Sequence, residues 1–186
     1  MDALPIAATK IQPPHLQRLG RRTRVARPAL EAALDQALHE AKVVLLQAPA
    51  GFGKTSLLSA LLAGVGPGTP LAWVSMDEDD DEQRFFACLA AALEPHDPPW
   101  RTAPEALAVS LGDEHDAPRA LVELINALAG IEARLGIVVL DDLHRVEQRG
   151  VHALIEGLVE RLPAHWVVVL SSRTLPPLPL ARWRAH

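Results

Sequence analysis

Short apolar runs alternate along the chain with stretches in which apolar residues recur every three or four positions. The runs lack polar alternation, which predicts strands buried on both faces, at residues 42–47, 71–76, 136–140 and 166–170. The helical spacing predicts helices at about 28–38, 55–63, 85–93, 118–128 and 151–162. Strands that alternate with helices indicate an α/β fold with a parallel sheet covered on both faces.

The two ends of the chain lack this pattern. Residues 1–27 contain three prolines and no apolar period, so we expect a lead segment that straps across the surface and adds nothing to the core. Residues 28–186 then form one domain. The proline-rich tail from Pro176 to Pro179 predicts an extended stretch after the fourth strand.

Composition excludes several classes of protein. The longest apolar runs, 43–46 and 137–140, are much shorter than the roughly 20 residues of a membrane span. No secretory signal is visible at the N-terminus, so we expect a cytoplasmic protein without membrane contact. The single cysteine, Cys88, cannot form an internal disulfide or a cysteine metal cluster.

Charge argues against DNA binding by this chain, because the formal net charge is −5. One basic cluster is the exception, and it is either a solvated segment or a grip for phosphates. It consists of Arg18, Arg21, Arg22, Arg24 and Arg27.

A phosphate-binding loop follows the first predicted strand and opens the next helix. It has the form [AG]-x-x-x-x-G-K-[ST]. Glycines let backbone N–H groups turn toward phosphate oxygens, the lysine meets the outer phosphates, and the threonine hydroxyl serves a magnesium ion. We therefore expect ATP and Mg²⁺ here. The loop is Ala48, Pro49, Ala50, Gly51, Phe52, Gly53, Lys54 and Thr55.

Two aspartates end the third strand, where a parallel sheet with a phosphate loop places its acidic site. We assign Asp141 to magnesium, which one carboxylate can hold with several waters, and Asp142 to the attacking water. The alternative is that both residues only cap the strand and start a turn. The fourth strand ends at the same edge in Arg173, which either senses the terminal phosphate or pairs with a surface acid.

Three other features favour structural roles. The acidic run 77–82 lacks the glycine and glutamate of an EF-hand loop, so we interpret it as the solvated start of a helix. His144 and His152 have no third metal ligand in a recognisable spacing, and Cys88 shares an apolar helix face with Phe85 and Leu89. We expect all three residues to be buried or structural.

Several segments together resemble the nucleotide-binding domain of MalT-type LuxR-family transcriptional regulators, which are NB-ARC/AAA-like STAND ATPases. The resemblance covers nearly the whole chain. It is carried by Thr9-Lys10, Arg27-Pro28-x-Leu30, A-P-A-G-F-G-K-T, A-W-V-S-M-D, Arg84-Phe85, L-D-D-L-H, Val151-His152 and S-S-R-T-L-P-P-L-P-L-A-R. In that group, ATP and inducer drive self-association, and a separate C-terminal helix-turn-helix binds DNA.

The resemblance implies a role for each matching residue. Lys54 and Thr55 serve the phosphates and magnesium, Asp141 and Asp142 form the acidic site, Arg173 is the sensor, and Arg27 lies near the base. Phe52 and Ser56 stand where the family often has tyrosine and threonine, a difference that leaves the nucleotide site intact.

The resemblance also implies a P-loop NTPase three-layer sandwich in which a fifth parallel strand lies beside strand 43–47. The chain ends before that strand, which predicts a sheet truncated at this edge. Such a bare edge invites pairing with another chain, so we expect marginal solubility, self-association, or cover from the lead or tail.

Three functions remain open at this point. The leading one is an ATP-binding switch module with slow or no hydrolysis. The second is a small P-loop kinase that passes phosphate to a metabolite, although no arginine-rich lid follows the acidic strand. The third is a truncated product without independent activity.

Overall fold

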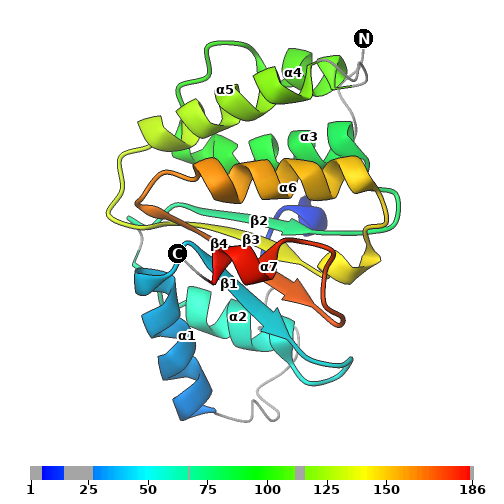
Figure 1. Cartoon of the computed structure of the whole chain (residues 1–186). Coiled ribbons are helices and arrows are strands. Elements are labelled where there is room, and N and C mark those ends of the chain that lie inside the picture. Colours follow the sequence, from blue (N-terminus) through cyan, green and yellow to red (C-terminus); the bar gives the residue numbers. More distant parts are fainter. Residues whose placement is uncertain (1–5, 15–26, 67, 112–115, 185–186) are drawn as a thin grey trace.

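The computed structural model describes residues 6–14, 27–66, 68–111 and 116–184 (Figure 1). Its centre is a parallel sheet in the order β1-β4-β3-β2. This arrangement confirms the expected α/β fold with a parallel sheet. The strands are β1 (Val43–Gln47), β2 (Leu71–Ser75), β3 (Gly136–Asp141) and β4 (Trp166–Ser172).

Helices cover both faces of the sheet, and α4 and α5 form a further layer outside α3 and α6 (Figure 1). The helices are α1 (Pro28–Glu40), α2 (Lys54–Leu62), α3 (Glu82–Leu93), α4 (Pro104–Ser110), α5 (Ala117–Gly130), α6 (Arg149–Arg161) and α7 (Leu180–Trp183). Short 3-10 turns are η1 (Ala8–Lys10), η3 (Glu94–His96) and η4 (Leu143–Arg145). None of the helices in the described ranges is long and apolar enough to cross a membrane.

Two apolar cores lie on opposite faces of the sheet. One joins α1 and α2 to inward side chains such as Trp73 and Val169, and the other joins α3, α4, α5 and α6 to side chains such as Val74 and Leu170. Successive side chains of a strand point to opposite faces of the sheet, so neighbouring residues in each strand belong to different cores. This two-sided burial explains why the strands are uniformly apolar.

The predicted elements all form, but α4 and α7 were not predicted. α4 has only seven residues and begins at Pro104. α7 has four residues and interrupts the tail that we expected to be extended. Both are too short to show a helical period.

The lead segment contributes to the core, contrary to our expectation. Ile6 and Ile11 pack against the core on the α3 and α6 face, and Lys10 is buried. η1 lies against β2. No periodic pattern predicts this packing, because the ion pairs of η1 join residues about 70 positions apart and η1 is a single turn.

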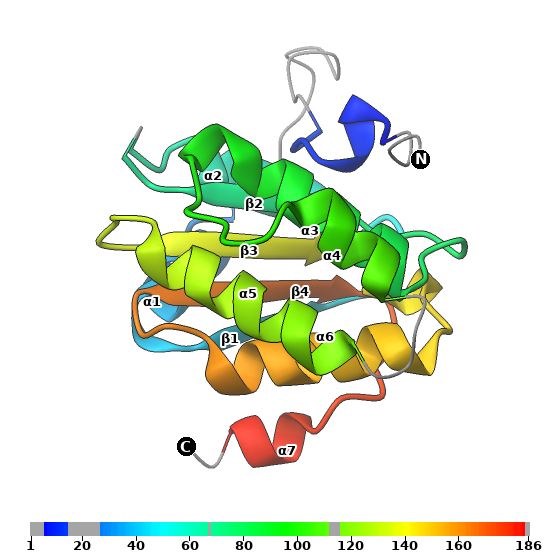
Figure 2. The same cartoon turned by 90° about the horizontal axis from the view of Figure 1, so that it is seen from above.

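β1 is an edge strand of the described sheet, as the prediction required. It pairs with β4 on one side, and the described residues supply no strand on the other. α7 lies toward this side of the sheet (Figure 2) without adding a strand to it. The outward row of β1 backbone groups therefore has no strand partner in the described part of the chain.

Candidate functional site

The turn between β1 and α2 has the backbone that a phosphate loop requires. Gly51 and Gly53 have φ values of 79° and 77°, which side chains on L-residues strongly disfavour. A Cβ at either position would meet no atom within 4 Å, so the glycines serve the backbone conformation rather than close packing. The loop from Pro49 to Gly53 is exposed to solvent.

The first turn of α2 presents backbone N–H groups that no capping side chain accepts from. Gly53 is its N-cap and supplies no side-chain hydrogen bond to the first turn. The free N–H groups of a helix N-terminus and its dipole favour an anion. Lys54 adds a full charge: its ammonium donates to the carbonyl oxygen of Ala48 at 2.7 Å and lies 3.4 Å from that of Pro49. The arrangement suits a polyanion such as a nucleotide phosphate chain.

Thr55 joins the loop to the acidic site. Its hydroxyl donates to Oδ2 of Asp141 at 2.8 Å. Asp141 is the last residue of β3 and is 3 % exposed, and its Oδ1 accepts from the backbone N–H of Asp142. The structure therefore places the two residues expected at magnesium side by side.

Asp142 has a different environment from its neighbour. Its backbone is left-handed, with φ of 56°, and its side chain is 36 % exposed. The carboxylate does not contact Thr55; its Oδ1 lies 3.9 Å from Nδ1 of His144. The αL turn thus directs the two adjacent carboxylates to different neighbours.

His144 is a residue of this site that the sequence analysis set aside as structural. Its side chain is 13 % exposed, and Nδ1 has no hydrogen-bond partner among the described residues. Burial lowers the pKa of His144; the charge of Asp142 opposes this shift, and Arg173 and Lys54 add to it. This shift favours the neutral form of the imidazole. Its place two residues after Asp142 was the available signal in the sequence.

Arg173 follows the last residue of β4 and is exposed. Because β4 runs parallel to β3, Arg173 lies at the same edge of the sheet as Asp141, and its charge helps to lower the pKa of His144. Among the ion pairs of the described residues, none joins Arg173 to a surface acid. β1, β3 and β4 thus bring the loop, the acids and this arginine to one edge.

Arg27 contacts the phosphate loop from the start of α1. Its Nη1 donates to the carbonyl oxygen of Phe52 at 3.1 Å. Phe52 is 56 % exposed, and Ser56 is exposed in the first turn of α2. The other arginines of the basic cluster, Arg18 to Arg24, lie outside the described residues.

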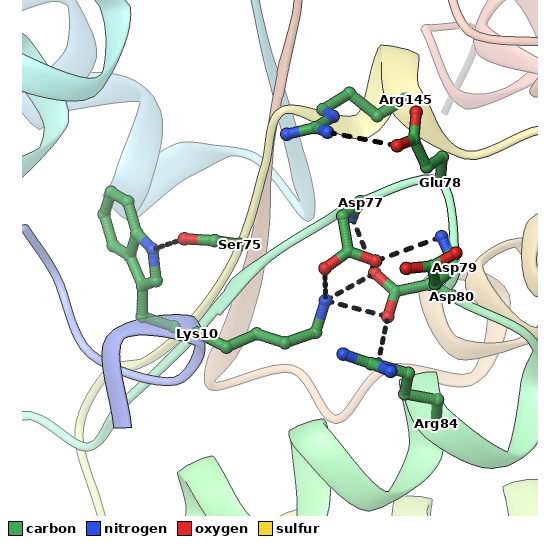
Figure 3. A network of polar contacts seen from close by, with 9 residues as sticks. Lys10, Ser75, Asp77, Glu78, Asp79, Asp80, Arg84 and Arg145 are labelled. Carbon is green, nitrogen blue, oxygen red and sulfur yellow. Dashed lines mark hydrogen bonds and ion pairs between the residues drawn. The ribbon is translucent and has the colours of Figure 1, made fainter. Parts of the chain in front are cut away.

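The acidic run after β2 differs from its sequence interpretation in one respect. Asp81 caps α3 by accepting from the N–H of Arg84, as a helix start should. Asp80, in contrast, is fully buried and pairs with Lys10 of η1, with Arg84 3.5 Å away (Figure 3). The acidic run 77–82 is therefore only partly exposed to solvent. The sequence analysis did not identify Lys10 as its partner, because the two lie about 70 residues apart in the chain.

This acidic network adjoins the candidate site. β2 ends at Ser75, which is in register with Asp141, and the N–H of Met76 donates to the carbonyl oxygen of Asp141 at 2.8 Å. Lys10 also pairs with Asp77 at 2.7 Å. η1 thus stabilises the loop that borders the acidic end of β3.

The residues present fit a nucleotide with a divalent cation. The uncapped end of α2 and the Lys54 ammonium suit phosphates, and the Thr55 hydroxyl and Asp141 carboxylate are the oxygen ligands that Mg²⁺ prefers. Within the described ranges, no three His, Cys, Asp or Glu side chains gather as a metal site. A cation shared with phosphates requires only one or two protein oxygens.

Comparisons with known proteins identify the family of the chain. The family model described as AAA ATPase domain matches residues 19–170. The HTH-type transcriptional regulator MalT of Klebsiella pneumoniae is 32 % identical over 163 residues, which are 87 % of this chain and 17 % of that protein. MalT of Serratia proteamaculans is 32 % identical over 147 residues, covering 78 % of this chain and 16 % of the relative. The chain therefore spans about a sixth of the length of these relatives.

Among solved structures, the Walker-type ATPase PABY2304 of Pyrococcus abyssi is similar over 82 % of this chain and 46 % of its own. Its TM-score is 0.49 at 16 % sequence identity.

Proposed function

The chain belongs to the AAA ATPase domain family, and from this premise we propose that it is the ATP-binding switch module of a signal-transducing transcriptional regulator. The observation that carries the proposal is the contact between Thr55 and Asp141, which joins the phosphate loop to the acidic end of β3. The similarity to the MalT regulators supports the regulatory setting. In this proposal residues 28–186 are the nucleotide-binding unit and residues 1–27 its lead.

Binding is the task of the loop and α2. The N–H groups of the loop from Ala48 to Gly53 and of the first turn, with Ser56, surround the phosphates, and Lys54 moves its ammonium from the loop carbonyls to the outer phosphates. Arg27 donates to the Phe52 carbonyl oxygen from the α1 side. The family resemblance assigns this arginine a place near the base. ADP uses the same donors.

Thr55 and Asp141 would hold Mg²⁺ beside the phosphates, where the ion neutralises their charge. The hydroxyl and the carboxylate already face each other, so little rearrangement is needed to share a cation. Asp141 is shielded from solvent, which favours a close contact with the ion.

Hydrolysis, where it occurs, depends on Asp142 and Arg173. Asp142 orients the attacking water, since its carboxylate is exposed and free of Thr55. Arg173 senses the terminal phosphate through its guanidinium. Slow turnover suits a switch that signals through its ATP-bound state. In this proposal the bound state promotes self-association. DNA binding is assigned to other parts of the regulator.

The test is calorimetric titration of the chain with ATP and ADP, with and without Mg²⁺, followed by phosphate-release assays. Lys54→Ala should lose about 2–5 kcal/mol of binding free energy, roughly 30-fold to several thousand-fold in affinity. Lys42→Ala, an exposed lysine before β1, is the matched control and should bind like the parent. Binding of ATP by Lys54→Ala within threefold of the parent would refute the proposal. Release of phosphate only with an added acceptor metabolite would favour a kinase instead.

A further inference from the structure

His144 lies beside Asp142 with one ring nitrogen buried and unpaired. Nδ1 of the imidazole is 3.9 Å from Oδ1 of Asp142, and the described residues offer it no hydrogen-bond partner. This distance exceeds the N···O separation of a hydrogen bond, which is about 2.7–3.2 Å. A movement of about 1 Å by either side chain would form the bond. The buried nitrogen is therefore close to a partner that it does not yet contact.

The backbone keeps the two side chains in this position. Asp142 has a left-handed conformation with φ of 56°, which residues other than glycine rarely adopt. The turn continues into η4, where the N–H of Arg145 donates to the carbonyl oxygen of Asp142 at 3.0 Å. Leu143, between the aspartate and the histidine, is buried in the core and anchors η4. Strained conformations of this kind persist where the surrounding structure enforces them, and they cluster at functional sites.

Only one form of the neutral imidazole can pair with Asp142. A neutral imidazole carries its hydrogen on one ring nitrogen and accepts a hydrogen bond at the other. An ionised carboxylate is only an acceptor, so Nδ1 must carry the hydrogen to bond to it. The lowered pKa of His144 favours the neutral form, in which the position of the hydrogen decides whether the pair can form.

The Asp142 carboxylate needs a donor to acquire a fixed direction. It is 36 % exposed, and among the hydrogen bonds of the described residues none is donated to this side chain. A carboxylate in this situation samples several side-chain rotamers. A donor that occupies one of its oxygens reduces this freedom and leaves the other oxygen pointing in a single direction.

We propose that His144 is a positioning residue for Asp142. With its hydrogen on Nδ1, the imidazole donates to one carboxylate oxygen of Asp142 and leaves the other oxygen for the attacking water. The inference rests on the proposed function, because it concerns the water-orienting role of Asp142. His144 acts through the carboxylate and does not touch the nucleotide.

The first test is the position of the hydrogen on His144, read from NMR spectra that correlate ring nitrogens with ring hydrogens at about pH 8, where neutral imidazole predominates. The full chain has eight histidines, and the spectrum of His144→Gln identifies the His144 signals by their loss. The parent should carry the hydrogen on Nδ1 with and without nucleotide. Asp142→Ala should shift it toward Nε2, because the acceptor that holds it is gone. A parent with the hydrogen on Nε2 would overturn the proposal, whether or not the chain binds ATP.

The second test separates positioning from a merely structural role. His144→Ala should lower the rate of phosphate release about tenfold or more and leave the calorimetric ATP affinity within about twofold of the parent. His144→Asn should restore most of the rate, because the asparagine amide donates from nearly the place of Nδ1. His39→Ala changes an exposed histidine of α1 and is the matched control, with the affinity and rate of the parent.

Two kinetic results would overturn the proposal while ATP binding stands. An unchanged rate in His144→Ala would remove the role, and an equal loss of rate in His144→Asn and His144→Ala would make the imidazole itself the reacting group. A parent that binds ATP without releasing phosphate is decided by the position of the His144 hydrogen alone. A parent that binds no ATP would instead refute the proposed function. Melting curves verify that each variant is folded.

Discussion

Thr55 donates its hydroxyl hydrogen to Oδ2 of Asp141 over 2.8 Å, although 86 residues separate them in sequence. The contact spans the strand between them, since β4 lies between β1 and β3. It ties the start of α2 to the end of β3 and distinguishes Asp141 from Asp142, which faces His144.

The first prediction concerns this difference. Asp141→Asn should weaken Mg²⁺-dependent ATP binding about tenfold, because an amide is a poorer ligand for a hard cation than a carboxylate. Asp142→Asn should keep ATP bound within about twofold and lower any hydrolysis, since its carboxylate acts on water. Calorimetry and phosphate release measure the two effects. Equal loss of ATP binding in both variants would contradict the assignment.

The second prediction concerns Lys10. Lys10→Met should lower the free energy of unfolding by about 3 kcal/mol, because it leaves the fully buried Asp80 with Arg84 alone. Urea unfolding measures the change, with Lys42→Met as the exposed control. A loss below about 1 kcal/mol would show that the pair adds little beyond its own desolvation cost.

The third prediction follows from the pKa of Asp77, which partial burial raises but which the hydrogen bond and charge of Lys10 lower overall, below 3.8. A carboxyl group whose pKa is lower in the folded than in the unfolded state stabilises the fold at pH values above its unfolded-state pKa. This contribution is lost as the pH falls through its folded-state pKa. The parent should therefore lose this contribution only below about pH 4. In Lys10→Met the acid side of the stability profile should be flatter, as urea unfolding from pH 6 to pH 2.5 would reveal.

The fourth prediction concerns the edge of β1. Lys42 and Ala48 bond to β4, so the alternation of a parallel ladder turns Val43, Leu45 and Gln47 outward. In dilute solution the amides of these three residues should exchange hydrogen much faster than those of Val44 and Leu46. Exchange that slows as the protein concentration rises would show that the edge pairs with another chain. Uniform protection along β1 in dilute solution would mean that the edge is already covered.

The fifth prediction concerns Cys88. Burial raises the pKa of its thiol to about 11, and the side chain is fully buried in α3. At pH 8 a thiol reagent should label it only as fast as the fold opens. Labelling rates with and without urea test this, and rapid labelling of the native chain would contradict the burial of Cys88.

Much of this protein is determined by the sequence alone. Uniformly apolar runs predicted all four strands, because a strand between two helical layers has no solvent face. The glycines and lysine of the loop predicted its backbone and its charge, since local chemistry sets both. The spacing of Asp141 and Asp142 after a strand predicted an acidic edge.

Only the tertiary structure decided which of these residues meet. The strand order brought Thr55 to Asp141 and placed β1 at the edge of the described sheet. It also buried Lys10 against Asp80 and brought His144 beside Asp142. These contacts form between layers whose residues are far apart in the sequence. Short elements such as η1 and α7 are too short to show a hydrophobic period, so the sequence pattern does not predict them. The physical reason is that periodicity reports one face of one element, whereas a site is made where several elements end together.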